Sequence, residues 1–184
     1  TAFIKWYYKS NPTQASKVNL LSYNGEFRMN NYKSNEQYLL DLNRFYFELT
    51  QINYNKMSKV KKKEYNRLEK FMLKLLYQEE NIKAAQWTPI FEIIQVERGL
   101  RYLLNYNYIS MKNKMSNIGM RLDRVNQILD NSLTNLFFIA VKDYNQSVKE
   151  IDLIIDLLES IDIRLDSADP NYETIVDKSK DVIL

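Results

Sequence analysis

One stretch of the sequence constrains the fold more than any other, because its apolar residues recur at alternating intervals of four and three. The series comprises Met111, Met115, Ile118, Leu122, Val125 and Leu129. This spacing places the six side chains on one face of an α-helix and is typical of a helix packed along a single seam. Glycine and proline, which interrupt helices, number only three each among 184 residues. We therefore predict an all-α protein.

Similar spacing predicts further helices on both sides of this one. Ser34 is the expected cap of a helix over 35–53, Ser58 caps one that ends near residue 86, and Thr88-Pro89 starts one that ends near residue 105. The other predicted helices cover residues 3–9, 12–21, from about 136 or somewhat later to 165, and 170–184. The expected architecture is an antiparallel bundle or array of about five longer helices plus short amino-terminal helices, in a single domain over 1–184.

Two of these helices have apolar stripes that we expect to be buried. The helix after Ser58 has Tyr65, Leu68, Phe71, Met72, Leu75, Leu76 and Ile82. The helix over 136–165 has Val148, Ile151, Ile154, Ile155, Leu158, Ile161 and Leu165. Trp6 and Trp87 are interpreted as core anchors.

The composition excludes several kinds of chemistry. The chain has no Cys and no His, so it has no disulfide, no zinc site of the usual ligand set and no nucleophile paired with a Cys or His. It also lacks a run of about 18 uncharged apolar residues that could span a membrane. Residues 143–184 contain eleven acidic and four basic residues, a net charge of −7, which leaves +10 for residues 1–142. We interpret this asymmetry as two oppositely charged faces of one bundle.

Glu97 and Arg101 are the most specific candidates for a binding site. They lie four residues apart, and the apolar residues around them predict an ion pair within the apolar face of the helix. Arg101 could bind a carboxylate or phosphate with Glu97 tuning it, although a structural pair that links helices is the favoured interpretation. Tyr102, Tyr106 and Tyr108 form a polar aromatic patch at the end of this helix, which we interpret as a half-buried connection rather than a ligand groove.

Two charged clusters have weaker claims to function. The basic cluster comprises Lys59, Lys61, Lys62, Lys63, Arg67, Lys70 and Lys74. We interpret it as a solvated helix face and expect no nucleic-acid binding, since no aromatic residues that could stack on bases are expected among these side chains. Asp152, Asp156 and Glu159 share one helix face and could hold a hard cation, but an ordinary surface is favoured, and we expect no metal or cofactor.

The order of short motifs resembles the amino-terminal half of the bacterial family called domain of unknown function 885. The motifs are Asn11-Pro12, Ala15-Ser16, Ser22-Tyr23-Asn24, Ile52-Asn53, Met57-Ser58, Glu64-Tyr65 with Leu68, Trp87-Thr88-Pro89-Ile90-Phe91, and Arg121-Leu122 followed by Ile128. Two features depart from the family pattern. No Gly follows Ala15-Ser16, and Phe137 stands where the family often has Pro after the Asn135-Leu136 element. Pro89 and Arg121 are assigned structural roles, together with the two Trp residues.

Members of that family are similar to helical zinc metallopeptidases whose zinc motif lies in the carboxy-terminal half. No residue here matches that motif, so the resemblance implies no catalytic or metal residue in this chain. It implies instead a non-catalytic amino-terminal domain of a longer protein, which helps to wall a substrate channel. The absent carboxy-terminal half is then the expected partner, docked on an exposed apolar surface near the carboxy-terminal end. The resemblance also suggests an exported or lipid-anchored protein.

Two other functions stay open. One is a self-standing helical adaptor that binds a partner protein through an exposed groove. The other, which we favour least, is an RNA- or DNA-binding module that uses the basic cluster over 59–74.

Overall fold

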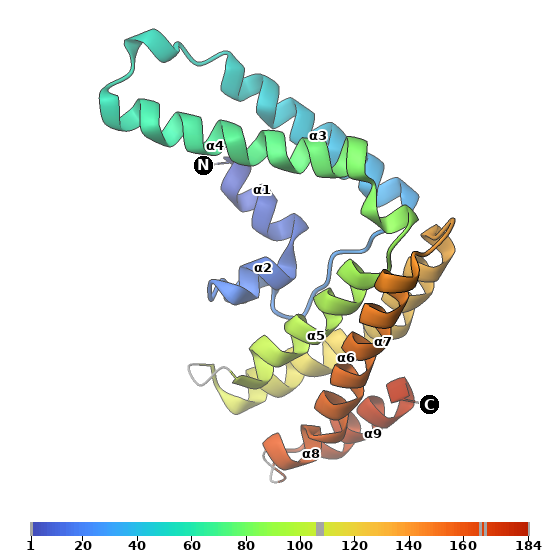
Figure 1. Cartoon of the computed structure of the whole chain (residues 1–184). Helices are drawn as coiled ribbons and strands as arrows, with labels where there is room; N and C mark the ends of the chain where they lie inside the picture. The colour runs from blue at the N-terminus through green and yellow to red at the C-terminus, as the bar shows by residue number, and fades with distance from the viewer. Residues whose placement is uncertain (1, 106–108, 166, 168, 184) are drawn as a thin grey trace. The chain divides into compact units, whose positions relative to one another are not determined.

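The computed structural model describes residues 2–105, 109–165, 167 and 169–183, and all the regular secondary structure in this part of the chain is helical. Figure 1 shows the elements in chain order. The α-helices are α1 (Ala2–Ser10), α2 (Pro12–Lys17), α3 (Tyr32–Thr50), α4 (Lys59–Tyr77), α5 (Ile90–Asn105), α6 (Met111–Asn135), α7 (Val141–Glu159), α8 (Ile161–Arg164) and α9 (Tyr172–Ile183). Short 3₁₀ turns lie at Leu21–Tyr23, Tyr54–Lys56 and Ala84–Gln86, and a π turn lies at Gln78–Ile82. The predicted all-α class is confirmed.

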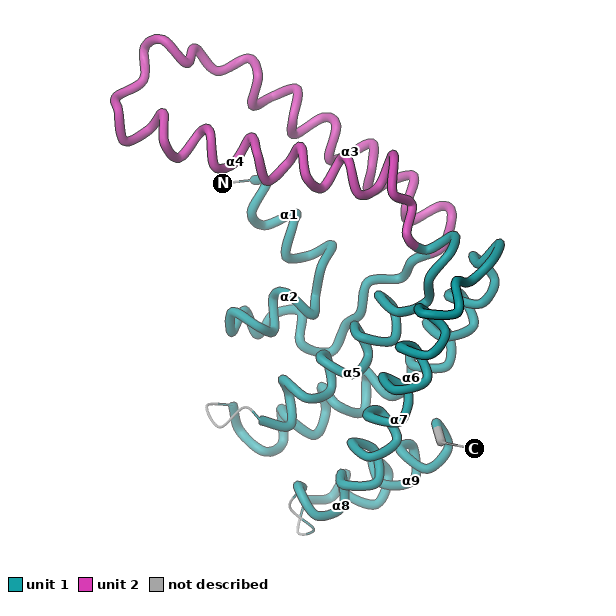
Figure 2. The backbone as a smooth tube through the Cα atoms, viewed as in Figure 1, with its two compact units in different colours: residues 1–30, 85–184 teal, residues 31–84 magenta. Residues whose placement is uncertain are grey.

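The chain forms two compact units, which Figure 2 distinguishes by colour. Unit 1 comprises residues 1–30 and 85–184, and unit 2 comprises residues 31–84. Unit 2 is a helical hairpin in which α3 packs against α4. The single domain over 1–184 stays a prediction.

The core of unit 1 lies between α5, α6, α7 and α9. Helix α5 contacts both α6 and α7, α9 contacts α6 and α7, and α2 packs on α5. The predicted seam of α6 is confirmed, because Met115, Ile118, Leu122 and Val125 are buried at its centre. At the two ends of the seam, Met111 and Leu129 are partly buried against the same cluster.

Side-chain caps explain where several helices begin. Ser58 Oγ accepts a hydrogen bond from Lys61 N, and Thr88 Oγ1 accepts one from Ile90 N, as the sequence predicts. The predicted cap at Ser34 is wrong. Asn31 occupies the cap position, its Oδ1 accepts from Ser34 N at 2.9 Å, and Ser34 Oγ accepts from Asn31 N at 3.1 Å. This reciprocal capping box starts α3 three residues earlier than predicted.

Three predicted helices are too long. The helix after Ser58 ends at Tyr77, because a π turn follows and Lys83 adopts a left-handed conformation with φ of 47°. The helix over 12–21 ends at Lys17, shortly before Asn19 with φ of 67°. The helix predicted from residue 136 or somewhat later begins at Val141, which agrees with the prediction, but it ends at Glu159 and not at residue 165, because Ser160 separates α7 from α8.

The predicted buried stripes are only partly correct. On α4 only Met72 and Leu76 are buried, whereas Phe71 is 37% exposed. Within unit 2, α4 packs against α3 and the π turn that follows α4, and these cover only part of its circumference. On α7 and α8 the structure buries Ile154, Leu158 and Ile161, whereas Val148 and Ile151 are each 40% exposed.

The assigned structural residues differ in burial. Pro89 is buried at the start of α5, and Arg121 is fully buried. Trp6 and Trp87 are half-buried, so neither lies inside the core as predicted. A large indole ring is rarely covered on all sides, which is the physical reason for the difference. Trp6 lies against Phe3, with ring centroids 5.7 Å apart. Among the described residues, no helix combines the length and apolar character needed to cross a membrane.

Candidate functional site

Arg121 on α6 is the most extensively bonded side chain of unit 1. Its Nη2 donates to Ser16 Oγ on α2 at 2.7 Å, its Nε donates to the Glu26 carbonyl at 3.2 Å, and its Nη1 donates to the Gly99 carbonyl on α5. Its guanidinium carbon lies 4.9 Å from the centre of the Phe27 ring. Since Arg121 is fully buried and its donors reach three separate segments, the arrangement joins helices and has no face open to a substrate.

The glycine at position 99 allows this close approach. A Cβ atom added to Gly99 would overlap the edge of the Phe27 ring and would lie 3.0 Å from Arg121 Nη1. The hydrogen bonds of Arg121 continue through Ser16, whose Oγ donates to Asn24 Oδ1 at 2.8 Å. Ser16 and Asn24 are both buried, so this polar network lies inside unit 1.

Glu97 and Arg101 form the predicted ion pair along α5, in which Arg101 Nε donates to Glu97 Oε1. The predicted burial holds for only one partner, since 9% of the Glu97 side chain is exposed but 39% of Arg101. The core side of α5 is centred on Val96, Leu100 and Leu103, which places Arg101 at the edge of the buried face.

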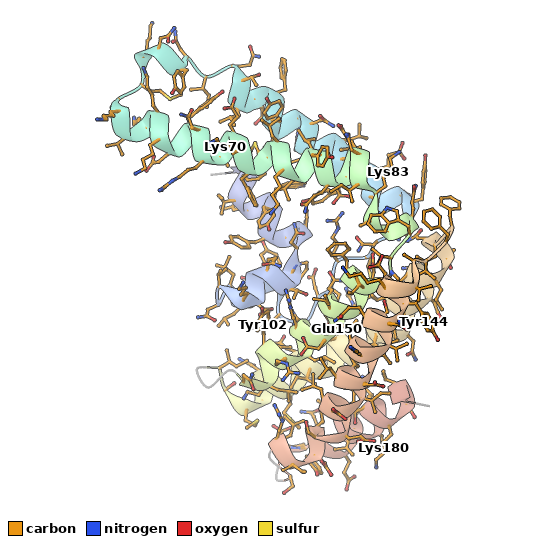
Figure 3. The ribbon with its side chains drawn as sticks, viewed as in Figure 1. Lys70, Lys83, Tyr102, Tyr144, Glu150 and Lys180 are labelled. Carbon is orange, nitrogen blue, oxygen red and sulfur yellow. The ribbon has the colours of Figure 1, made fainter. Side chains whose placement is uncertain are left out.

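Tyr102 lies on the same helix and is partly buried against the core, as labelled in Figure 3. The other two members of the predicted aromatic patch, Tyr106 and Tyr108, lie outside the described residues. The structure therefore gives no geometry for a ligand groove at this end of α5.

Two buried charged groups escaped the sequence analysis. Glu92, which is 2% exposed, accepts a hydrogen bond from Asn30 Nδ2 at 2.8 Å. Lys114 is 6% exposed and its Nζ donates to the Leu104 carbonyl at 3.2 Å, near the end of α5. Burial lowers the pKa of Lys114 below the ordinary value for lysine. Helical spacing could have predicted the burial of Glu92, because Glu92 lies one turn before Val96 on the buried face of α5. The spacing around Lys114 gives no indication that Lys114 is buried.

The two charged clusters lie on exposed helix surfaces. Six of the seven basic residues of α4 are exposed, and Lys62 is half-buried with its Nζ 5.0 Å from the centre of the Tyr54 ring. Two aromatic residues of the same helix, Phe71 and Tyr77, are 37% and 59% exposed, and the absence of nucleic-acid binding stays a prediction. Lys70 in Figure 3 marks this helix. Asp152, Asp156 and Glu159 are exposed on α7, and no group of three potential ligands within the described part of the chain could hold a metal ion.

Several exposed apolar residues of unit 1 lie in the segment before α7 and on α7 itself. We call this group the α7 patch, and it comprises Phe137, Phe138, Ile139, Val141, Tyr144, Val148 and Ile151. The exposed fractions reach 79% at Phe137 and 78% at Val141. Figure 3 labels Tyr144, which is 57% exposed. The patch lies over residues 137–151 and not at the carboxy-terminal end, where the resemblance implies an exposed apolar surface and where Val182 packs against the core.

The comparisons with known proteins show the fold. Neither the scan against protein-family models nor the search of curated proteins finds a match. A solved chain from Shewanella oneidensis, described as "a putative lipoprotein of unknown function", is similar with a TM-score of 0.82 at 16% sequence identity. The match covers 99% of this chain and 34% of that one. This chain therefore spans about a third of the length of the solved protein that it resembles.

Proposed function

We propose that this chain is the non-catalytic, amino-terminal helical part of a longer protein of the 885 type, a relative of helical zinc metallopeptidases. Its role is to form one wall of a substrate channel, while the zinc site belongs to the remainder of the protein. The observation that carries the proposal is the coverage of the fold match, because nearly the whole of this fold occurs within a third of a longer chain.

The described polar groups agree with a role as a scaffold. Arg121 is fully buried and bonded to its own unit, and the Arg101 guanidinium is held by Glu97. The chain has neither Cys nor His with which to bind zinc in the usual way. A place in the cell envelope is part of the same proposal, and the description of the Shewanella protein supports it.

The test compares this 184-residue chain with the full product of its gene. Both are purified, and bound zinc and hydrolysis of a mixed peptide library are measured with and without a strong chelator. We expect zinc and chelator-sensitive hydrolysis only in the longer protein. The 184-residue chain should unfold at the same temperature with and without chelator. A longer protein that contains neither zinc nor peptidase activity would contradict the proposal, as would a reading frame that stops after Leu184.

A self-standing adaptor is the second candidate function, and the α7 patch is the observation that favours it. A stop codon directly after Leu184, together with saturable binding of a partner protein that is lost on substituting Val141 by Glu, would establish this alternative. The same substitution should leave the helical content unchanged, because the Val141 side chain is 78% exposed.

A further inference from the structure

The α7 patch is as large as the largest apolar patches that single proteins expose. A fully exposed aromatic side chain presents on the order of 200 Å², so the exposed fractions of Phe137, Phe138 and Tyr144 correspond to about 400 Å². A Val or Ile side chain presents about 100 Å², so the four aliphatic members add about 200 Å². The largest apolar patch on a typical monomer is about 300–600 Å² and is often functional. One partner of a stable interface buries about 800 Å², of which roughly 56–65% is apolar, so the patch is large enough to form the apolar part of one side of an interface.

The members of the patch are consecutive or nearly so along the chain. Residues 136 and 140, which flank its first three members, are extended, and Phe137 N donates to the Gln86 carbonyl at 2.8 Å, which ties this segment to the chain before α5. Val141 then opens α7, and Tyr144, Val148 and Ile151 follow at intervals of three, four and three. These four side chains share one face of the helix. This exposed apolar face of α7 is adjacent to the buried face, which contains Ile154, Leu157 and Leu158.

The charges on α7 indicate what kind of surface fits the patch. The helix contains two lysines, Lys142 and Lys149, against five carboxylates, which gives a net charge of −3. Asp152, Asp156 and Glu159 are all exposed. A second copy of the chain would bring another acidic α7 against this one, and like charges placed opposite each other disfavour such an interface. A partner whose apolar residues are flanked by Lys or Arg complements it.

We propose that the α7 patch is the docking surface for the remainder of the parent chain, through an apolar face flanked by basic residues. This inference rests on the proposed function, because it requires a longer parent protein. The fold match supplies the reason for choosing that occupant, since the similar fold in the Shewanella chain is attached to about twice its own length of further protein.

The test measures how fast single cysteines react in the full-length parent protein. The 184 residues contain no native cysteine, so Val141→Cys introduces one reactive thiol within the patch, and Val60→Cys on α4 is the matched control. The two valines are 78% and 68% exposed, so exposure alone does not distinguish them. The lysines that flank position 60 favour the reactive thiolate, so each rate is divided by the rate of the same cysteine in the urea-unfolded parent before the two are compared. We expect a maleimide to modify the cysteine at position 141 at least ten-fold more slowly than the one at position 60 on this scale.

Three results would overturn the docking proposal: equal rates at the two positions, a parent reading frame that ends at Leu184, or a dimer of the 184-residue chain that protects position 141. The charge part is tested by adding Asp152→Lys and Asp156→Lys to the Val141→Cys variant, which should accelerate the reaction several-fold. An unchanged rate would refute a basic partner. Zinc content and peptidase activity are measured in separate assays. If the cysteine at position 141 is protected but the parent protein contains no zinc, the docking proposal stands and the assignment to a zinc peptidase is refuted.

Discussion

Replacing Gly99 by Ala tests whether the contact between α5 and α6 depends on the missing side chain at this position. The natural control is Gly119→Ala, the same substitution in α6. At Gly119 an added Cβ would lie 3.5 Å from Ile175 Cδ1, which is ordinary van der Waals contact. At Gly99 it would overlap the Phe27 ring, which is 3% exposed and has little room to move.

The two substitutions should change stability in opposite directions. Ala is favoured over Gly within a helix by about 1 kcal/mol, and this gain applies at both positions. At Gly119 little opposes it, so we expect the variant to be about 0.5–1 kcal/mol more stable. At Gly99, overpacking costs about 1–3 kcal/mol, and displacing the Phe27 ring weakens a buried contact with Arg121 worth about 2 kcal/mol. We expect Gly99→Ala to be about 1–3 kcal/mol less stable than the wild type.

Urea unfolding followed by tryptophan fluorescence measures this difference. Trp6 and Trp87 both belong to unit 1, so the fluorescence change reports on the unit that contains the two glycines. The chain has two compact units, and a single probe of the whole chain would mix their transitions. The reasoning is refuted if Gly99→Ala matches or exceeds the wild-type stability, or if Gly119→Ala is destabilised as much as Gly99→Ala.

Three further predictions concern buried charges, with urea unfolding as the measurement. Arg121→Lys should cost more than about 2 kcal/mol, because one ammonium group cannot reach the acceptors on Ser16, Glu26 and Gly99 together; a loss below about 0.5 kcal/mol would contradict this role. Glu97→Ala should cost about 1–2 kcal/mol, less than the 3–5 typical of a fully buried pair, because Arg101 can turn to solvent. A loss of about 4 kcal/mol would show that the pair is more buried than described. Burial lowers the pKa of Lys114, so between that value and 10.5 the unfolded state binds more protons and stability rises with pH. Lys114→Met should remove this rise, and an unchanged pH slope in the variant would contradict it.

The features predicted correctly from the sequence depend on local spacing. The seam from Met115 to Val125 is visible in the sequence because helical periodicity alone determines which residues share a face. The caps at Ser58 and Thr88 are equally local, since each involves a backbone group within three residues. The Arg121 network joins residues up to 105 positions apart, and no local pattern indicates such contacts.

Periodicity also fails to show whether an apolar face has a neighbour. Phe71, Val148 and Ile151 belong to regular apolar stripes, yet all three are at least 37% exposed. In α4 the packing of α3 and the π turn on only part of the helix limits burial, and in α7 the apolar surface extends beyond the face that contacts α5 and α9. The sequence identified these residues as apolar, but only the tertiary arrangement could show that they lie at the surface.

The contrast between the buried polar groups and the exposed apolar groups of unit 1 bears directly on function. Arg121 and Lys114, which are 0% and 6% exposed, both direct donors at backbone carbonyls within the unit. A group engaged in this way would have to break its bonds to bind a substrate, which costs about 1–3 kcal/mol for each acceptor left unsatisfied. The α7 patch differs, because its exposed apolar side chains are in contact with water and covering them with another surface lowers the free energy. The exposed apolar side chains of unit 1 therefore favour association with another surface, and the reaction rates of the cysteines at positions 141 and 60 measure whether the proposed parent protein supplies it.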